Sequence, residues 1–397
     1  MSSVLAIGVL MLSGLAVGRI ASGSGLSSVI GYLVAGLVLG HAWPGLGGSI
    51  SAAGAGFVAE IGLALITFVI GGELEVERLR ALPRSVVGIT VAQAVGSLAA
   101  VAGAAHLLGQ PTGLGLILGA IAAATAPSTT IMIARKQKSE GPLTQALVSV
   151  VAMNDSVCIL MYAMAIAVAR ALPDGVVSRT LTGVIGISAW EVLGSAVVGV
   201  VVGIALGFFV KYARGADELI VIVLGSILLT SGLSGRMHVS PIIASLVLGV
   251  TVSNLVVGSR KVFAAVDRFS PPIYVLLFCL AGVPVRFRSL WAALGFFLAY
   301  VVARALGKVV GVWISAALSG ADRGVRRYLG VSLLPQAGLA AALAVAACAA
   351  LPEQSEMIAS MVIPGVLLFE AIGPAIVVMS LKKAGEIRLP EASAVKA

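Results

Sequence analysis

Apolar runs long enough to cross a bilayer follow one another along almost the whole 397-residue chain. A membrane-spanning helix needs roughly 20 predominantly apolar residues. Because the bilayer interior has no water to pair with backbone groups, such runs fold as helices that satisfy their own hydrogen bonds. The charged fraction is 11%, whereas a typical soluble domain is about one quarter charged. The chain is therefore predicted to be an all-α polytopic membrane protein.

Charged residues and Gly, Pro or Ser breaks divide the chain into about thirteen predicted spans. They lie near residues 3–20, 26–42, 54–71, 83–108, 111–134, 143–170, 189–210, 217–233, 239–256, 271–284, 290–318, 326–349 and 357–381. Nineteen of the 26 lysine and arginine residues fall in the loops after the odd-numbered spans and in the C-terminal tail. Because basic loops stay in the cytoplasm, the C-terminus is predicted to be cytoplasmic and the N-terminus outside. The expected location is a cell membrane, in particular a bacterial inner membrane.

Two ionisable groups lie deep inside these spans. Asp155, next to Asn154, is in the middle of the apolar run 147–169, and Lys308 lies in the run 291–318. An ionisable group at that depth costs several kcal/mol, so it indicates an ion or proton pathway. A buried carboxylate and a buried ammonium together predict a transporter that handles a cation, a proton or both.

Three further acids need an interpretation. Glu60 and Glu370 also lie in apolar runs. We interpret Glu60 as a structural polar partner, whereas structural and functional roles are both open for Glu370, whose candidate partners are Lys308 and Arg304. Glu73 ends a predicted helix close to basic residues and is expected in a solvated loop.

Other functional classes have little support in the sequence. There is no HExxH, GxSxG or P-loop motif, so no enzyme activity is predicted. The cysteines, Cys158, Cys279 and Cys348, lie in apolar runs without metal-ligand spacing and are expected to be packing residues. The net charge of +9 is explained by basic cytoplasmic loops, so no nucleic-acid partner is expected, and no cofactor is expected either.

The two halves of the chain echo each other. SSVIGYLVAGLVLG at 27–40 is similar to SPIIASLVLG at 240–249, and IGLALITFVIGGEL from Ile61 is similar to IYVLLFCLAGVPV from Ile273. Each pair is seven spans apart, and an odd offset reverses orientation. The pattern predicts inverted repeats joined by a linker helix near 189–210, which is typical of secondary transporters with a site near the bilayer midplane.

Proline breaks occur at corresponding places in the two halves. The fifth span carries Thr125-Ala126-Pro127-Ser128-Thr129-Thr130, and the twelfth carries Pro335-Gln336-Ala337-Gly338. Proline removes a backbone donor and frees a carbonyl. Two such unwound stretches that cross at mid-membrane would present helix ends and carbonyl oxygens to an ion. The candidate ligands of a monovalent cation are then Asp155 with the hydroxyl oxygens of Thr125, Ser128, Thr129 and Ser156.

Four segments in order resemble the monovalent cation/proton antiporter superfamily, in the branch that holds bacterial sodium/proton and potassium-efflux antiporters. They are VIGYLVAGLVLG at 29–40, VAEIGLALITFVIGGEL at 58–74, GPLTQALVSVVAMNDSV at 141–157, and ALGKVVG at 305–311 followed by LLPQAGLA at 333–340. Each segment is weak alone, whereas the ordered set covers residues 1 to about 382. The resemblance implies the form that has no C-terminal nucleotide-sensing domain.

The resemblance also implies an arrangement into domains. A core domain with crossed, discontinuous helices moves against a dimerisation domain in an elevator-like motion, and the protein is a homodimer in the lipid membrane. The implied boundaries are 1–82 and 215–288 for dimerisation helices, 83–170 and 289–382 for core ion-transport helices, 171–214 for the linker helix, and 383–397 for a cytoplasmic tail.

The family's Asn-Asp or acidic pair falls on Asn154 and Asp155, and its core lysine falls on Lys308. The resemblance implies that Na⁺ or K⁺ and a proton bind alternately at Asp155, with Lys308 and Glu370 modulating the site. The stoichiometry stays open, because Asn154 favours one proton per cation whereas the lysine is linked to electrogenic exchange. Coupled transport of an organic solute on the same fold is the alternative function, and a passive channel is disfavoured because no selectivity-filter motif is present.

Overall fold

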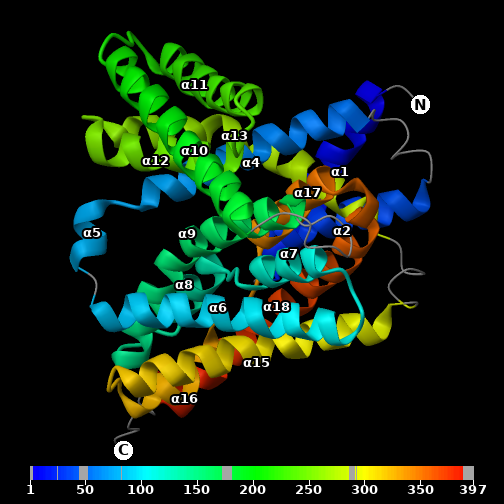
Figure 1. Cartoon of the computed structure of the whole chain (residues 1–397), viewed down its shortest axis with the longest axis vertical. Coiled ribbons are helices and arrows are strands. Elements are labelled where there is room, and N and C mark those ends of the chain that lie inside the picture. Colours follow the sequence, from blue (N-terminus) through cyan, green and yellow to red (C-terminus); the bar gives the residue numbers. More distant parts are fainter. Residues whose placement is uncertain are drawn as a thin grey trace, which may run out of the picture.

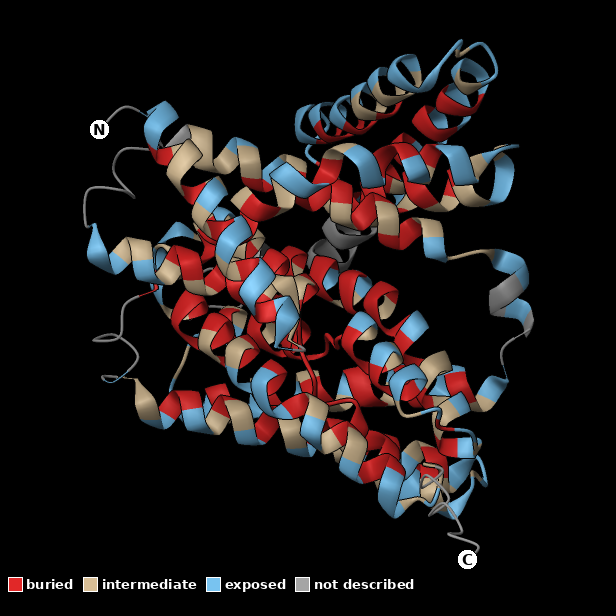
Figure 2. Cartoon of the chain, turned by 180° about the vertical axis from the view of Figure 1, so that it is seen from behind, coloured by how far each residue is buried: buried red, intermediate tan, exposed pale blue. Residues whose placement is uncertain are grey.

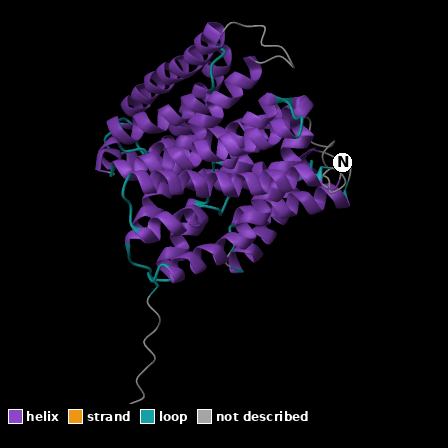
Figure 3. Cartoon of the chain, turned by 60° about the horizontal axis from the view of Figure 1, so that its bottom comes forward, coloured by secondary structure: helices purple, strands orange, loops and turns teal. Residues whose placement is uncertain are grey.

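A computed structural model describes residues 3–24, 26–43, 52–81, 83–171, 181–285, 291 and 293–387. In these ranges the chain forms helices and connecting loops, with no strand (Figure 3). Within the described residues, ten helical stretches are long and apolar enough to cross a membrane, and three shorter apolar helices accompany them. The prediction of an all-α polytopic membrane protein is confirmed. Parts of the predicted linker (172–180) and of the predicted tail (388–397) lie outside the described residues.

The helices of the first half are α1 (Ser3–Gly23), α2 (Ser28–Ala42), α4 (Ala52–Glu73), α5 (Val76–Ala81), α6 (Arg84–Leu107), α7 (Thr112–Ala122), α8 (Pro127–Lys136) and α9 (Pro142–Ala171). Those of the second half are α10 (Leu181–Val210), α11 (Ala216–Arg236), α12 (Pro241–Leu255), α13 (Ser259–Gly282), α15 (Leu294–Leu318), α16 (Arg323–Ser332), α17 (Gly338–Ala350), the 3₁₀ turn η1 (Pro352–Gln354) and α18 (Ser355–Lys383).

The contacts between helices divide them into two groups, and Figure 1 shows α11–α13 of one group at the top and α6, α15 and α16 of the other at the bottom. We call α6–α9 with α15–α18 the crossover bundle, and α1, α2, α4 and α11–α13 the panel. Helices of each group pack mainly on one another, and the connections between the groups run chiefly through α4, α13 and α17. Helix α10 packs along α12 on the panel side and also reaches α9 of the bundle.

Contacts inside the panel repeat in the pattern that an internal duplication requires. Helix α2 packs on α13, and α4 packs on α12. Both α2 and α12 have 15 residues and begin after a serine, Ser27 or Ser240, whose hydroxyl accepts a backbone hydrogen bond at the helix start. In the predicted repeat, α2 corresponds to α12 and α4 corresponds to α13. The α2–α13 contact is therefore the counterpart of the α12–α4 contact. This matches the predicted seven-span offset.

Glycine makes these two panel contacts close. A Cβ atom at Gly36 would overlap the backbone of Cys279 on α13, and one at Gly249 would overlap the backbone of Phe68 on α4. Backbones approach to this distance only where side chains are absent, which is a common way of packing helices in membranes. The glycine-rich composition of the chain therefore has a structural use in the panel.

Both predicted helix breaks are confirmed. Helix α7 ends at Ala122 and α8 begins at Pro127, while α16 ends at Ser332 and α17 begins at Gly338. Pro127 occupies the first helical position, where its missing N–H costs nothing. Figure 2 shows buried residues concentrated in the middle of the molecule, where these breaks lie. The cysteines are free thiols, with Cys158 and Cys279 buried and Cys348 half-buried, as expected of packing residues.

Glu386, which follows α18, caps the N-terminal end of α9. Glu386 accepts hydrogen bonds from the backbone N–H groups of Leu143 (2.7 Å) and Thr144 (2.7 Å) and from the Thr144 hydroxyl (2.7 Å). Its own carbonyl accepts from the Glu140 N–H at 3.1 Å. A Cβ atom at Gly141, where φ is +157°, would overlap the Glu386 carboxylate. A carboxylate on the free N–H groups of a first turn stabilises a helix, so Glu386 fixes the entry of the helix that carries Asp155.

Glu386→Ala is expected to destabilise the protein by about 1–2 kcal/mol, because it removes a charged cap from α9. The measurement is thermal unfolding in detergent, compared with Glu353→Ala, which removes an exposed glutamate from η1. Equal melting temperatures for the two variants would show that Glu386 does not stabilise the start of α9.

Candidate functional site

The two helix breaks meet inside the crossover bundle, and Arg304 of α15 joins them. Its guanidinium donates to the carbonyl of Leu334 at 2.9 Å and to the carbonyl of Ala124 at 3.0 Å. The Gln336 amide donates to the carbonyl of Ile121 at 3.1 Å. The carbonyls of Leu334 and Ala124 lie just after the end of an interrupted helix, where the helical donor is missing, whereas the Ile121 carbonyl also accepts from the backbone N–H of Ala124. Side chains therefore replace the missing helical hydrogen bonds.

Lys308, one turn further along α15, binds the same region. Its ammonium donates to the carbonyl of Ala123 at 2.7 Å and to the side-chain oxygen of Gln93 on α6 at 2.7 Å. Both Arg304 and Lys308 are fully buried. A buried cation is less costly where its donors find acceptors and the local field is negative. The carbonyl end of a helix supplies both to these two side chains, although Arg304 Nε has no hydrogen-bond partner. The two cations thus neutralise the end of α7.

Asn154 connects this cluster to α9. Its side-chain nitrogen donates to Thr125 Oγ1 at 3.0 Å and to the carbonyl of Ala123 at 3.2 Å. Its side-chain oxygen accepts from Gln93, whose amide therefore links Asn154 to Lys308. Gln93 was not among the predicted site residues, although a glutamine inside the apolar span 83–108 is a signal that could have found it. Lys308 therefore hydrogen-bonds to Gln93 and to the Ala123 carbonyl, and neither of these hydrogen bonds is to Asp155.

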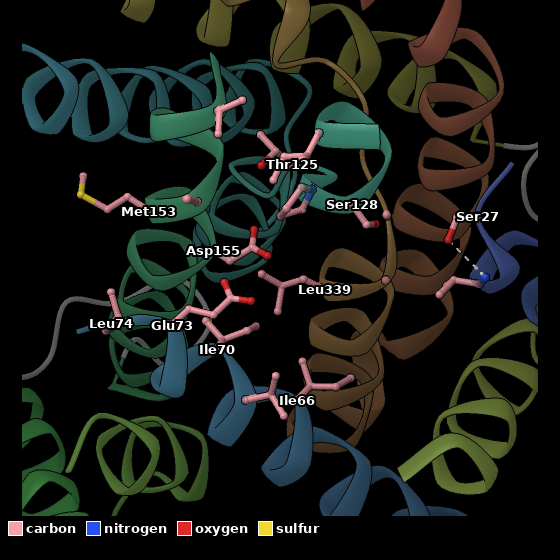
Figure 4. Close-up of a pocket in the computed structure, with 18 of the residues that line it drawn as sticks. Ser27, Ile66, Ile70, Glu73, Leu74, Thr125, Ser128, Met153, Asp155 and Leu339 are labelled. Atoms are coloured by element: carbon pink, nitrogen blue, oxygen red, sulfur yellow. Dashed lines mark hydrogen bonds between the residues drawn. The ribbon is translucent and has the colours of Figure 1, made fainter. Parts of the chain in front are cut away.

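Asp155, the neighbour of Asn154 on α9, lines a cavity of about 800 Å³ between the bundle and the panel (Figure 4). Thr125 and Ser128 line the same cavity, together with Pro127 and Gly338 from the two breaks. Asp155 is 8% exposed, and its Oδ1 atom is buried without a hydrogen-bond partner. This oxygen has no hydrogen-bond donor, and its residue lines a cavity that exposed residues also line. Such a carboxylate is suited to take up a proton or a cation.

The other predicted ligands lie outside this cavity. Ser156 is buried with no partner for its hydroxyl, and Thr129 donates to Glu370 Oε1 at 2.6 Å. The structure therefore brings Asp155, Thr125 and Ser128 together and separates Thr129 and Ser156 from them.

Glu370 of α18 is buried beside the first turn of α8. Its one hydrogen bond is the one from Thr129, and its Oε2 atom is buried without a partner. Its candidate partners Lys308 and Arg304 bind carbonyl and amide oxygens instead. An acid near a helix start is favoured by the helix dipole, just as the cations are favoured at the end of α7.

Pro335 of the second break has a packing role. A Cβ atom at Gly373 on α18 would lie 2.8–3.0 Å from the Pro335 ring, so Gly373 lets α18 approach the unwound segment closely.

Glu73 is a site residue that the sequence analysis placed differently. It is the last residue of α4 and is exposed, as expected of a loop residue, but it lines the cavity that holds Asp155. Figure 4 shows the Glu73 and Asp155 side chains at the same part of the cavity, and their charges interact electrostatically. Glu60, by contrast, accepts a 2.5 Å hydrogen bond from Ser231 on α11, consistent with a structural polar partner inside the panel.

Comparisons with known proteins agree with this architecture. Residues 6–382 match the family described as sodium/hydrogen exchanger, transmembrane. The structure of the sodium proton antiporter MjNhaP1 from Methanocaldococcus jannaschii superposes with a TM-score of 0.73, covering 96% of this chain and 98% of that one at 18% identity. At that identity, the likeness concerns the fold.

Two curated relatives are similar in sequence. The ammonium/H⁺ antiporter subunit AmhT from Alkalihalophilus pseudofirmus is 22% identical over 79% of this chain and 80% of its own length. The chloroplastic K⁺ efflux antiporter 2 from Arabidopsis thaliana is 26% identical over 59% of this chain, which covers 21% of that longer protein.

Arg304→Met is expected to lower stability by about 2–5 kcal/mol, because the buried carbonyls of Ala124 and Leu334 lose their donors. Thermal unfolding in detergent measures the change, with Arg326→Met as the matched control, since Arg326 is an exposed arginine on α16. A loss no larger than that of the control would show that Arg304 does not hold the two breaks together.

Proposed function

The chain belongs to the sodium/hydrogen exchanger transmembrane family, and on that premise we propose that it exchanges Na⁺ or K⁺ for protons at Asp155. The observation that carries this proposal is the position of the carboxylate. Asp155 lines a cavity that residues of both helix breaks also line, and its Oδ1 atom has no donor. Thr125 and Ser128, which carry hydroxyl groups, line the same cavity.

One carboxylate is enough to couple the two ions. Protonated, it is neutral and binds no cation; ionised, it attracts one. Because Asp155 holds either ligand but not both, each proton released on one side permits one cation to bind there. Asn154 cannot titrate, and it holds the amide network in place beside the acid.

The arrangement of helices supports alternating access. Asp155 belongs to the crossover bundle, whereas the opposite wall of the cavity belongs to α2, α4 and α13 of the panel. We propose that the bundle moves as a unit against the panel, in an elevator-like motion, and that the panel forms the homodimer interface. The internal hydrogen bonds of Arg304, Lys308 and Gln336 would keep the bundle intact during this motion.

A second candidate function is coupled transport of an organic solute on the same fold. The observation that favours it is the cavity itself, since about 800 Å³ of mostly apolar lining is within the range of small-molecule sites. Cation/proton exchange remains the better supported function because of the family and because a buried acid, Asp155, lines the cavity.

Proteoliposomes that hold a pH gradient are expected to lose it when Na⁺ or K⁺ is added, and NH₄⁺ belongs in the same series because a relative carries that name. Asp155→Asn is expected to abolish the flux, because an amide neither titrates nor offsets the charge of a desolvated cation. Asp217→Asn, which alters an exposed acid in the first turn of α11, should transport normally. If none of the cations moves protons through folded wild-type protein, organic solutes become the leading candidates.

Competition at one carboxylate also fixes the sign of the pH dependence. Where Asp155 is largely protonated, each further unit of acidification should raise the apparent KM for the cation up to about tenfold, with little change in the maximal rate at saturating cation. Initial rates measured over a matrix of pH and cation concentration give this result. A KM independent of pH, with a falling maximal rate, would indicate separate proton and cation sites.

A further inference from the structure

We propose that Glu73 collects the cation for Asp155 on one side of the membrane only. This role deepens the proposed function and rests on it. It makes Glu73 a determinant of cation affinity that belongs to the panel, whereas the ion site itself belongs to the crossover bundle.

The composition of the cavity supports this role. Among the described residues that line the cavity, Glu73 and Asp155 are the charged ones, and most of the others are apolar side chains such as Ile66, Ile70 and Phe278. Walls of low polarity focus the field of a charge into the space between them and raise the local concentration of counter-ions. Two carboxylates at one end of such a cavity therefore attract a cation more strongly than Asp155 does alone.

The two acids differ in a way that suits successive roles. Glu73 is exposed at the end of α4, whereas Asp155 is 8% exposed and has a buried oxygen without a partner. A hydrated cation meets Glu73 while it keeps most of its water. It then loses water to reach Asp155, where the hydroxyl of Thr125 is within the same cavity.

The helix dipole makes the end of α4 an unfavourable position for an acid. Glu73 ends α4, and the C-terminal end of a helix carries a partial negative charge that disfavours a carboxylate. The negative charge of Glu73 also repels the negative charge of Asp155. A cation that lies between the two acids offsets both unfavourable interactions, so the pair favours an occupied site.

The effect is confined to one side because Glu73 and Asp155 are on different groups of helices. When the bundle moves, Asp155 leaves Glu73 behind with the panel. The other embedded acid of α4, Glu60, is 13 residues earlier, a distance of about 20 Å along the helix. It accepts from Ser231 and lines a separate cavity of about 420 Å³ that holds no second acid among its described residues.

The test measures cation KM from each side of the membrane, in everted and in right-side-out vesicles. Glu73→Gln is expected to raise KM about three- to tenfold from the side onto which the cavity opens, which the loop charges predict to be cytoplasmic. KM from the other side and the maximal rate should stay unchanged. Glu60→Gln is the matched control on the same helix and should change neither KM.

A charge-restoration experiment within one variant removes the question of folding. Glu73→Cys in a Cys348→Ser background leaves Cys158 and Cys279 buried. A membrane-impermeant, negatively charged thiosulfonate added from the cavity side should restore a low KM, whereas a positively charged one should raise KM further. Unmodified and modified protein are the same polypeptide, so a difference between them reports charge.

The outcomes separate this role from the proposed function. If wild-type protein exchanges cations for protons but Glu73→Gln has the same KM from both sides as wild type, the role of Glu73 is wrong and the exchange function stands. An equal rise in KM from both sides, or loss of transport from both sides by folded protein, also overturns the one-sided role. If wild-type protein exchanges no cation, the proposed function fails, and this inference fails with it.

Discussion

The pairing of buried cations with the carbonyl ends of two interrupted helices is the constraint on which the rest of this structure depends. A helix that stops in mid-membrane leaves carbonyl groups that no water can reach, at a cost of several kcal/mol each. Arg304 and Lys308 bind three such carbonyls, those of Leu334, Ala124 and Ala123. A buried cation and an unpaired buried carbonyl each raise the free energy of the folded protein. When they hydrogen-bond to each other, much of both penalties is offset.

This arrangement also separates positive from negative side chains within the bundle. The cations lie at the end of α7, while Glu370 lies beside the first turn of α8, where the helix dipole favours an acid. Gln93 and Asn154 form a neutral spacer that links Lys308 to α9, the helix that carries Asp155. Asp155 is thereby left without a direct bond to a fixed cation. A carboxylate held by a permanent ion pair would exchange its ligand slowly, so the spacer suits a site whose partner must be mobile.

The interface between the two groups of helices has a different character. Inside the panel, glycines at Gly36 and Gly249 let helix backbones pack in close contact. Between panel and bundle lies the cavity with mostly apolar walls, in which Glu73 and Asp155 are the charged lining residues among those described. Closely packed groups of helices separated by a cavity with mostly apolar walls are suited to relative motion, and the proposed elevator-like exchange relies on this contrast.

The sequence by itself determined the class, the spans, the breaks and the identity of the buried acid. Hydropathy fixes spans because the bilayer permits few structures, and Pro127 and Asp155 are conspicuous because proline and charge are costly there. Only the tertiary structure decided which polar groups meet. Lys308 binds Gln93, Glu370 binds Thr129, and Glu73 shares a cavity with Asp155. Periodicity carries no information about contacts between helices more than 200 residues apart in the chain. Glu73 has the local sequence of a loop residue, and its place at the site depends on how α4 packs against α9.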